Sequence, residues 1–144
     1  MLIGEYKHTI DSKKRLAIPV KLRKDLGQKA VLTKGLDQCL TLYSLDEWSK
    51  VTAKLSELPM GPGNSRSFSR LMLAGAVEVE FDSLGRVLVP EYLKQYAGIG
   101  QKVVVAGLYN RLEIWDEGKW NSYKSSAESS ADMIAEKLGE LGLY

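Results

Sequence analysis

The chain has 144 residues, of which 44% are apolar and 26% charged, a composition that favours a folded protein over a disordered one. Its 20 basic and 18 acidic side chains leave a net charge of +2, and a single cysteine and a single histidine exclude an internal disulfide and a Cys/His metal site within one chain. Because neither an apolar run of roughly 18 residues nor a secretory signal is visible, we expect a cytoplasmic protein that has no membrane span, metal or cofactor.

One sequence motif occurs twice. Residues 11–19 (DSKKRLAIP) return as residues 82–90 (DSLGRVLVP), with Asp, Ser, Arg and Pro at identical places. Residues 35–43 and 107–115 form a second match, in which Gly-Leu precedes an apolar strand pattern. Two ordered matches at nearly constant spacing indicate an internal duplication. Because a copy of about 45 residues is small for an independent core, we expect the two copies to share one core.

The first copy predicts a strand, a turn, a strand, a short helix, two strands joined by a turn, and a second helix. Residues 11–14 form the first turn, since Asp at the first turn position can bond to its own backbone. Pro19 takes the first position of the short helix, and Leu22 and Leu26 give that helix its buried stripe. The remaining elements are a buried strand at residues 30–32, a hairpin turn at residues 35–38, and a helix that Ser44 caps and that carries Trp48, Val51 and Leu55 on one side.

A linker and a helix separate the two copies. Residues 59–64 combine Pro and Gly, as loops do, and residues 65–74 predict a helix. The second copy predicts a half-buried strand at residues 78–81, turns at residues 82–85 and 107–110, a short helix that begins at Pro90, and a buried strand at residues 103–105. Residues 125–141 predict a final helix, whose thin apolar face packs either on its own chain or on another subunit.

These elements divide the chain into four parts. Residues 1–58 form the first repeat, residues 59–76 the linker and bridging helix, residues 77–124 the second repeat, and residues 125–144 the C-terminal helix. Charge is distributed unequally among them, because residues 1–50 carry a balance of +4 whereas residues 77–144 carry −4. The near-neutral total therefore hides a basic first repeat and an acidic second half.

The basic residues of the first repeat form two groups, three in the first turn and three on the short helix: Lys13, Lys14, Arg15, Lys21, Arg23 and Lys24. A run of charge is usually a solvated surface. The second repeat, however, has Leu84 and Gly85 in place of two of these lysines, so folding alone does not require them. We therefore predict that the six residues contact DNA phosphates, and that Arg15 reaches base edges.

The aspartates and arginines shared by the two motifs have a structural interpretation as well. Asp11 and Asp82 are expected to form their turns rather than act as functional acids. Arg86 is expected to be structural, and the alternative role of Arg15 is a pair with Asp11 inside its own loop. No convergent set of acid, base and nucleophile is visible, so we expect neither an enzyme nor a small-molecule substrate.

The whole chain resembles the MraZ family of bacterial transcriptional regulators of cell-division and cell-wall operons. The resemblance rests on residues 1–6 (MLIGEY), 71–76 (LMLAGA) and 107–115 (GLYNRLEIW), and on the two D-x-x-x-R motifs. It implies an α+β, mainly β fold, in which two tandem AbrB-like repeats form a swapped-hairpin, double-split β-barrel with flanking helices. One departure is Lys14, which occupies a place where the family commonly has Gly. If the turn needs a positive φ at that residue, either Lys14 carries strain or the turn type differs.

The resemblance also implies partners and a function. We expect a nucleoid-associated homo-oligomer, in the form of a ring, that binds short direct repeats of double-stranded DNA in its own promoter and acts as a repressor. The alternatives are an AbrB-like antitoxin or a structural, oligomer-forming interaction protein. Salt-dependent DNA binding distinguishes the first function from the other two, because the affinity of a phosphate-contacting protein falls as salt rises.

Overall fold

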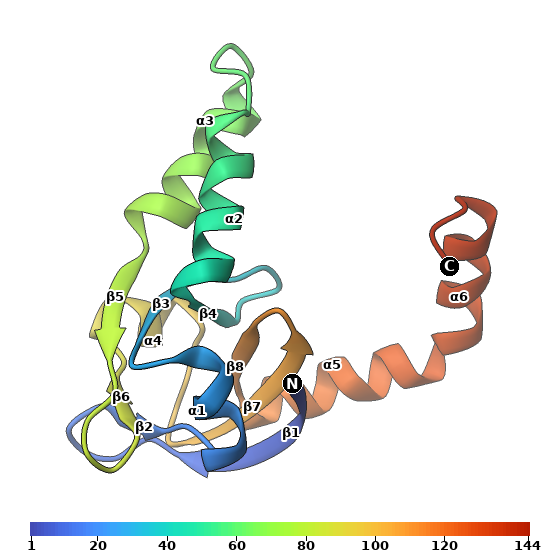
Figure 1. The fold of residues 1–144 in the computed structure, drawn as a ribbon. Coiled ribbons are helices and arrows are strands. Elements are labelled where there is room, and N and C mark those ends of the chain that lie inside the picture. The colour runs from blue at the N-terminus through green and yellow to red at the C-terminus, as the bar shows by residue number, and fades with distance from the viewer.

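The computed structural model describes residues 1–144 (Figure 1). The first repeat consists of β1 (Leu2–Thr9), β2 (Arg15–Ala17), α1 (Val20–Leu26), β3 (Lys29–Lys34), β4 (Leu40–Ser44) and α2 (Leu45–Ser56). A third helix, α3 (Gly63–Ser69), continues into a π-helical turn, η1 (Arg70–Ala74). The second repeat consists of β5 (Val77–Glu80), β6 (Arg86–Leu88), α4 (Glu91–Tyr96), β7 (Lys102–Tyr109) and β8 (Leu112–Asp116), and is followed by α5 (Glu117–Ser129) and α6 (Ala131–Glu140).

The two repeats exchange their first strands. The larger sheet is antiparallel and has the order β1-β7-β8-β4-β3-β5, so β1 of the first repeat pairs with β7 of the second, and β5 of the second pairs with β3 of the first. The smaller sheet is a ribbon in which β2 pairs with β6. The predicted α+β, mainly β fold with swapped hairpins is thus confirmed.

The strand register reveals a pseudo-two-fold axis between the repeats. In the ribbon, Leu16 lies opposite Val87, and in the larger sheet Thr41 lies opposite Glu113. Each of these pairs joins equivalent positions of the two copies, as an axis through the pair requires. The two repeats therefore meet as the subunits of a symmetric dimer do, although they belong to one chain.

One apolar core fills the space between the sheets. Its buried cluster draws on both repeats, with Leu16 and Leu22 from the first and Val87 and Leu93 from the second, all 1% exposed or less. Burying a side chain of this size contributes about 1.5–3 kcal/mol. The expectation of a single shared core is confirmed. Cys39 is also buried, although it lies outside this cluster.

Two kinds of element boundary differ by a few residues from the prediction: the start of the short helices and the end of β7. Pro19 is the residue before α1, where its extended ψ of 137° lets its carbonyl accept from the N–H groups of Leu22 and Arg23; Pro90 does the same before α4. Gly107 lies inside β7 rather than in a turn. A glycine is needed there because β1 passes so close that a Cβ would lie 2.6 Å from the nitrogen of Ile3. The hairpin turns beyond it, where the N–H of Leu108 donates to the carbonyl of Arg111.

The helices between the repeats form an arm that projects from the sheets (Figure 1). The predicted helix at residues 65–74 begins earlier, at Gly63, and its last turn is the π-helical η1. Ser44 caps α2, as expected, by accepting from the N–H of Glu47. The base of the arm is anchored where buried Thr33 donates to the carbonyl of Met72 at 2.7 Å.

The final helical segment differs from the prediction of one helix over residues 125–141. Helix α5 begins already at Glu117, because Asp116 caps it and because Trp120 and Tyr123 pack on Trp115 with ring centroids 5.5 and 5.0 Å away. The helix breaks at Ser130, and α6 lies beyond the far end of α5, apart from the sheets (Figure 1). Four apolar side chains of this segment are exposed: Met133, Ile134, Leu138 and Leu141. No helix of the structure has the length and apolarity that crossing a membrane requires.

The strand exchange predicts that neither half of the chain folds alone as a monomer. Fragments 1–60 and 61–144, divided in the exposed linker, are each expected to lack cooperative unfolding as monomers. In the first fragment β1 and β2 have lost their only partners, and β3 keeps β4 but has lost β5. Mixing the two is expected to restore the circular dichroism spectrum and the unfolding transition of the intact chain. A cooperatively folded monomer of fragment 1–60 would contradict this prediction.

Candidate nucleic-acid interface

The first D-x-x-x-R motif is a loop that its own aspartate organises. The backbone N–H groups of Lys13 and Arg15 donate to Oδ1 of Asp11 at 2.9 Å, and the Nε of Arg15 donates to Oδ2 at 2.8 Å. The N–H of Lys14 closes the turn on the carbonyl of Asp11. Asp11 therefore forms the turn, as expected, and also fixes the direction of the Arg15 side chain, while the two terminal nitrogens of the guanidinium take no part in these bonds.

The second motif repeats the same bonds. Asp82 accepts from the N–H groups of Leu84 and Arg86 at 2.9 and 2.8 Å, and from the Nε of Arg86 at 2.8 Å. The hydrogen bonds from the backbone N–H groups of Arg15 and Arg86 are the main reason why the pKa values of Asp11 and Asp82 lie below their ordinary value. The shared aspartate and arginine thus serve the same structural purpose in both copies.

The two loops differ at the residue before the arginine. Lys14 has a φ of 62° and Gly85 a φ of 73°, so both are in the left-handed region that favours glycine. The first turn therefore does need a positive φ at Lys14, which is the condition under which strain is expected there. The Nζ of Lys14 lies 2.9 Å from the Glu91 carboxylate of α4, and this hydrogen bond is the main reason why the pKa of Glu91 is lowered.

Gly85 has a neighbour that explains its lack of a side chain. It is buried, and a Cβ at this position would overlap the guanidinium of Arg23, which reaches it from α1. The Nε of Arg23 is itself buried and has no hydrogen-bond partner. Each loop therefore contacts the short helix of the other repeat, since Lys14 pairs with α4 and Arg23 of α1 covers Gly85.

The ribbon between the loops has an outward face that carries both motif arginines. Leu16 and Val87 point into the core, so the residues on either side of them point outward. Arg15 lies opposite Leu88, and Arg86 lies opposite Ala17. The two arginines are thus diagonal neighbours on one face, and the diagonal spacing across such a strand pair is about 7–8 Å. A two-stranded ribbon of this kind is narrow enough to enter the major groove of DNA, which is about 12 Å wide.

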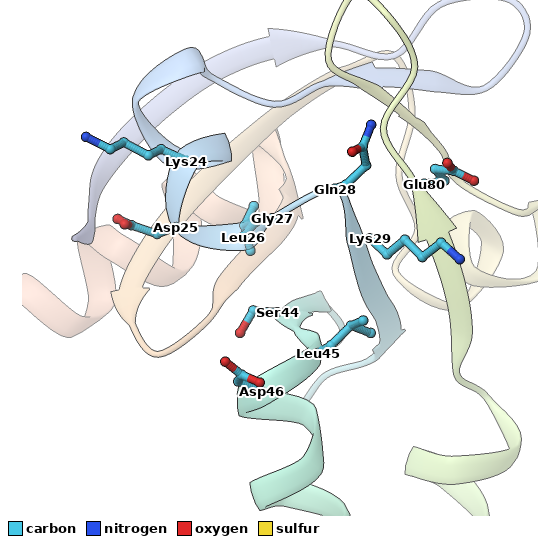
Figure 2. A pocket seen from close by; sticks show the side chains of 10 residues that line it. All are labelled: Lys24, Asp25, Leu26, Gly27, Gln28, Lys29, Ser44, Leu45, Asp46 and Glu80. Carbon is cyan, nitrogen blue, oxygen red and sulfur yellow. The ribbon is translucent and has the colours of Figure 1, made fainter.

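The predicted basic residues do not all lie in one place. Lys13 is exposed at the tip of the first loop, beside the outward face of the ribbon, whereas Lys21 and Lys24 are exposed on α1 and Arg23 is half-buried against the second loop. Lys24 stands at the edge of a shallow hollow that also contains Asp25, Asp46 and Glu80 (Figure 2). Because these three acids outnumber the two lysines of the lining, Lys24 and Lys29, the hollow does not offer a basic surface to phosphate.

Three contacts near this surface were not predicted from the sequence. Glu91 neutralises part of the charge of Lys14, and the terminal ammonium of Met1 pairs with Asp25, the single acid between Lys13 and Lys34. Leu88 stands beside Arg15 on the ribbon. No local signal indicates these contacts, because each joins segments that are distant in the sequence.

The chain matches a known protein family over nearly its whole length. The model of the family described as "MraZ protein, putative antitoxin-like" matches residues 1–71 and again residues 72–140. Three similar relatives, each named "Transcriptional regulator MraZ", come from Acetivibrio thermocellus, Caldanaerobacter subterraneus subsp. tengcongensis and Clostridium botulinum. They are 49%, 48% and 48% identical to this chain over 143 residues, which is 99% of the chain and the full length of each relative.

The lowered pKa values of the two aspartates predict how stability depends on pH. A carboxyl whose pKa is depressed in the folded state stabilises the fold above its unfolded pKa of about 3.9, and this stabilisation is lost as the pH falls through the folded value. The variant Asp11→Asn/Asp82→Asn is expected to be less stable than the parent at pH 7, and the difference is expected to narrow below about pH 4. Urea unfolding, monitored by tryptophan fluorescence at pH 7 and below about pH 4, measures the free energy of unfolding of the variant and of the parent. Asp132→Asn on exposed α6 is the control and is expected to change nothing.

The left-handed φ of Lys14 predicts an unusual order of variants. At position 14, glycine is expected to give a more stable protein than alanine by about 1 kcal/mol, because both lose the pair with Glu91 but only alanine keeps the strain. At the neighbouring Lys13, whose φ is not positive, alanine is expected to be at least as stable as glycine. Thermal unfolding of the four variants tests this, and the same order at both positions would contradict it.

Proposed function

Because the chain belongs to the MraZ family, whose relatives are named as transcriptional regulators, we propose that it binds promoter DNA through its first D-x-x-x-R loop and the outward face of the β2–β6 ribbon. The observation that carries this proposal is the difference between two loops of the same backbone design. Lys13 and Lys14 stand in the first loop where Leu84 and Gly85 stand in the second. Since the second loop makes the same turn without these cations, folding does not account for them.

The proposed contacts follow from the position of each cation. Lys13 and Lys14 neutralise phosphates at the edge of the groove. Arg15 enters the groove, where its two terminal nitrogens donate to the O6 and N7 of a guanine. Asp11 holds this side chain by its Nε, so less rotamer freedom is lost when DNA binds. The cations of α1, Lys21, Arg23 and Lys24, contact flanking phosphates, while Asp11, Asp82 and Arg86 maintain the two loops.

We extend the proposal to the assembled protein. Several copies form a ring through their exposed helical segments, and the apolar side chains of α6 support such contacts because they have no cover on their own chain. Each copy engages one short direct repeat, and linkage of the copies strengthens weak individual contacts by orders of magnitude. The chain thereby represses the promoter of its own division and cell-wall gene cluster and is located on the nucleoid. In this proposal the chain has four parts: a basic repeat at residues 1–58, a bridge at residues 59–76, a second repeat at residues 77–124 and a C-terminal segment at residues 125–144.

Replacing the basic loop tests the proposal. The variant Lys13→Ala/Lys14→Ala/Arg15→Ala is expected to lose binding to the DNA upstream of the chain's own gene in a gel-shift assay. For the parent protein, the logarithm of the affinity is expected to fall with the logarithm of the salt concentration, with a slope near −0.9 for each phosphate contacted, and residual binding by the variant is expected to have a slope shallower by about 2–3.

The matched control removes the same charge elsewhere. Lys54, Lys102 and Lys137 are exposed on α2, β7 and α6, so their triple alanine variant has the same net charge as the loop variant. It is expected to bind DNA nearly as the parent does, while size-exclusion chromatography is expected to show both variants in the parental oligomeric state. Undiminished binding by the loop variant, or an equal loss in the control, would reject the assignment of the loop.

A further inference from the structure

The outward face of the ribbon holds an exposed leucine that the fold does not use. Leu88 is 56% exposed, although its neighbours Val87 and Val89 are 1% and 0% exposed. It lies directly opposite Arg15 in the strand pairing. Single exposed apolar residues are common on protein surfaces, and exposure alone would indicate nothing. The position of Leu88, across from the arginine that we assign to the groove, is what distinguishes it.

The equivalent place in the first repeat is occupied differently. Ala17 corresponds to Leu88 in the duplicated motif and lies opposite Arg86. One end of the ribbon therefore presents an arginine with a large apolar side chain, and the other presents an arginine with a single methyl group. The backbone of the two ends is related by the pseudo-two-fold axis, so this difference belongs to the side chains alone.

We propose that Leu88 is a specificity-determining residue that contacts the C5-methyl group of thymine in the major groove, next to the base pair that Arg15 contacts. This inference rests on the proposed function. The thymine methyl is the apolar group that base pairs display on the major-groove edge, and apolar side chains recognise it. Opposite residues of an antiparallel pair have Cβ atoms about 5 Å apart, and successive base pairs are about 3.4 Å apart, so the two side chains reach neighbouring base pairs.

The same asymmetry gives the bound chain a direction on DNA. The end with Lys13, Lys14, Arg15 and Leu88 combines phosphate contact, hydrogen bonding and methyl contact. The end with Ala17 and Arg86 has Leu84 and Gly85 in its loop and therefore no lysine of its own there. A symmetric ribbon would read each half of an inverted repeat equally. An asymmetric ribbon favours one orientation, and successive copies then bind sites that point the same way.

The test removes the apolar group either from the DNA, as the thymine methyl, or from the protein, as the Leu88 side chain. The DNA upstream of the chain's own gene is amplified with dTTP or with dUTP, which yields two duplexes that differ only in the thymine methyl groups. The parent protein is expected to bind the uracil duplex about fourfold more weakly for each methyl group that it contacts. Leu88→Ala is expected to bind the thymine duplex more weakly and to show a reduced difference between the two duplexes. Leu88→Ser is a second variant in case the first does not fold.

A matched leucine provides the control. Leu36 is 61% exposed in the turn between β3 and β4, away from the ribbon, and Leu36→Ala is expected to keep the full parental difference between the duplexes. If the parent binds neither duplex at low salt, the proposed function fails, and the inference fails with it. If the parent binds but Leu88→Ala keeps the full difference, the inference alone is overturned. A changed oligomer mass of Leu88→Ala, with the difference retained, would assign Leu88 to a contact between copies and would also overturn it.

Discussion

Strand exchange between the two repeats is the constraint on which the rest of the structure depends. β1 finds its partner in β7, β5 finds its partner in β3, and the ribbon requires one strand from each repeat. Because neither repeat can satisfy its own strand edges, the two share one core and meet around a pseudo-two-fold axis. The exchange also brings the two D-x-x-x-R loops to opposite ends of one ribbon, where the N–H of Val89 donates to the carbonyl of Lys14 and the N–H of Ile18 to that of Gly85.

The aspartate of each loop holds the turn and the arginine in place, so the residues between them are not needed for this purpose. Asp11 and Asp82 satisfy three donors each with the same geometry, so the turn and the direction of the arginine depend on two residues of the motif. The residues between them are free to diverge. In one copy they became Lys13 and Lys14, with some backbone strain at the second of these, and in the other they became Leu84 and Gly85. A duplicated fold thus presents two electrically different ends to the same surroundings.

The neighbours of each loop match the residue before its arginine, although they reduce the difference in charge between the two ends. Arg23 covers Gly85, and Glu91 pairs with Lys14, so a glycine suits one loop and a cation is accepted in the other. Beside the arginines, Leu88 and Ala17 extend the asymmetry to the outward face of the ribbon. Both ends have the same backbone, and they differ in a few side chains that do not contribute to the core.

Local chemistry is what the sequence by itself determined: the duplication, the Asp-based turns, the cap at Ser44, the buried stripes and the basic character of the first loop. Each of these depends on residues close together in the chain or on a count of charges. The tertiary structure decided the rest, namely that Gly107 serves a close approach of β1 and that Arg15 stands opposite Leu88. Both facts depend on pairing between strands that lie far apart in the sequence. The alternation of apolar residues along one strand shows which of its faces is buried, but packing around the common core decides which distant strand it pairs with.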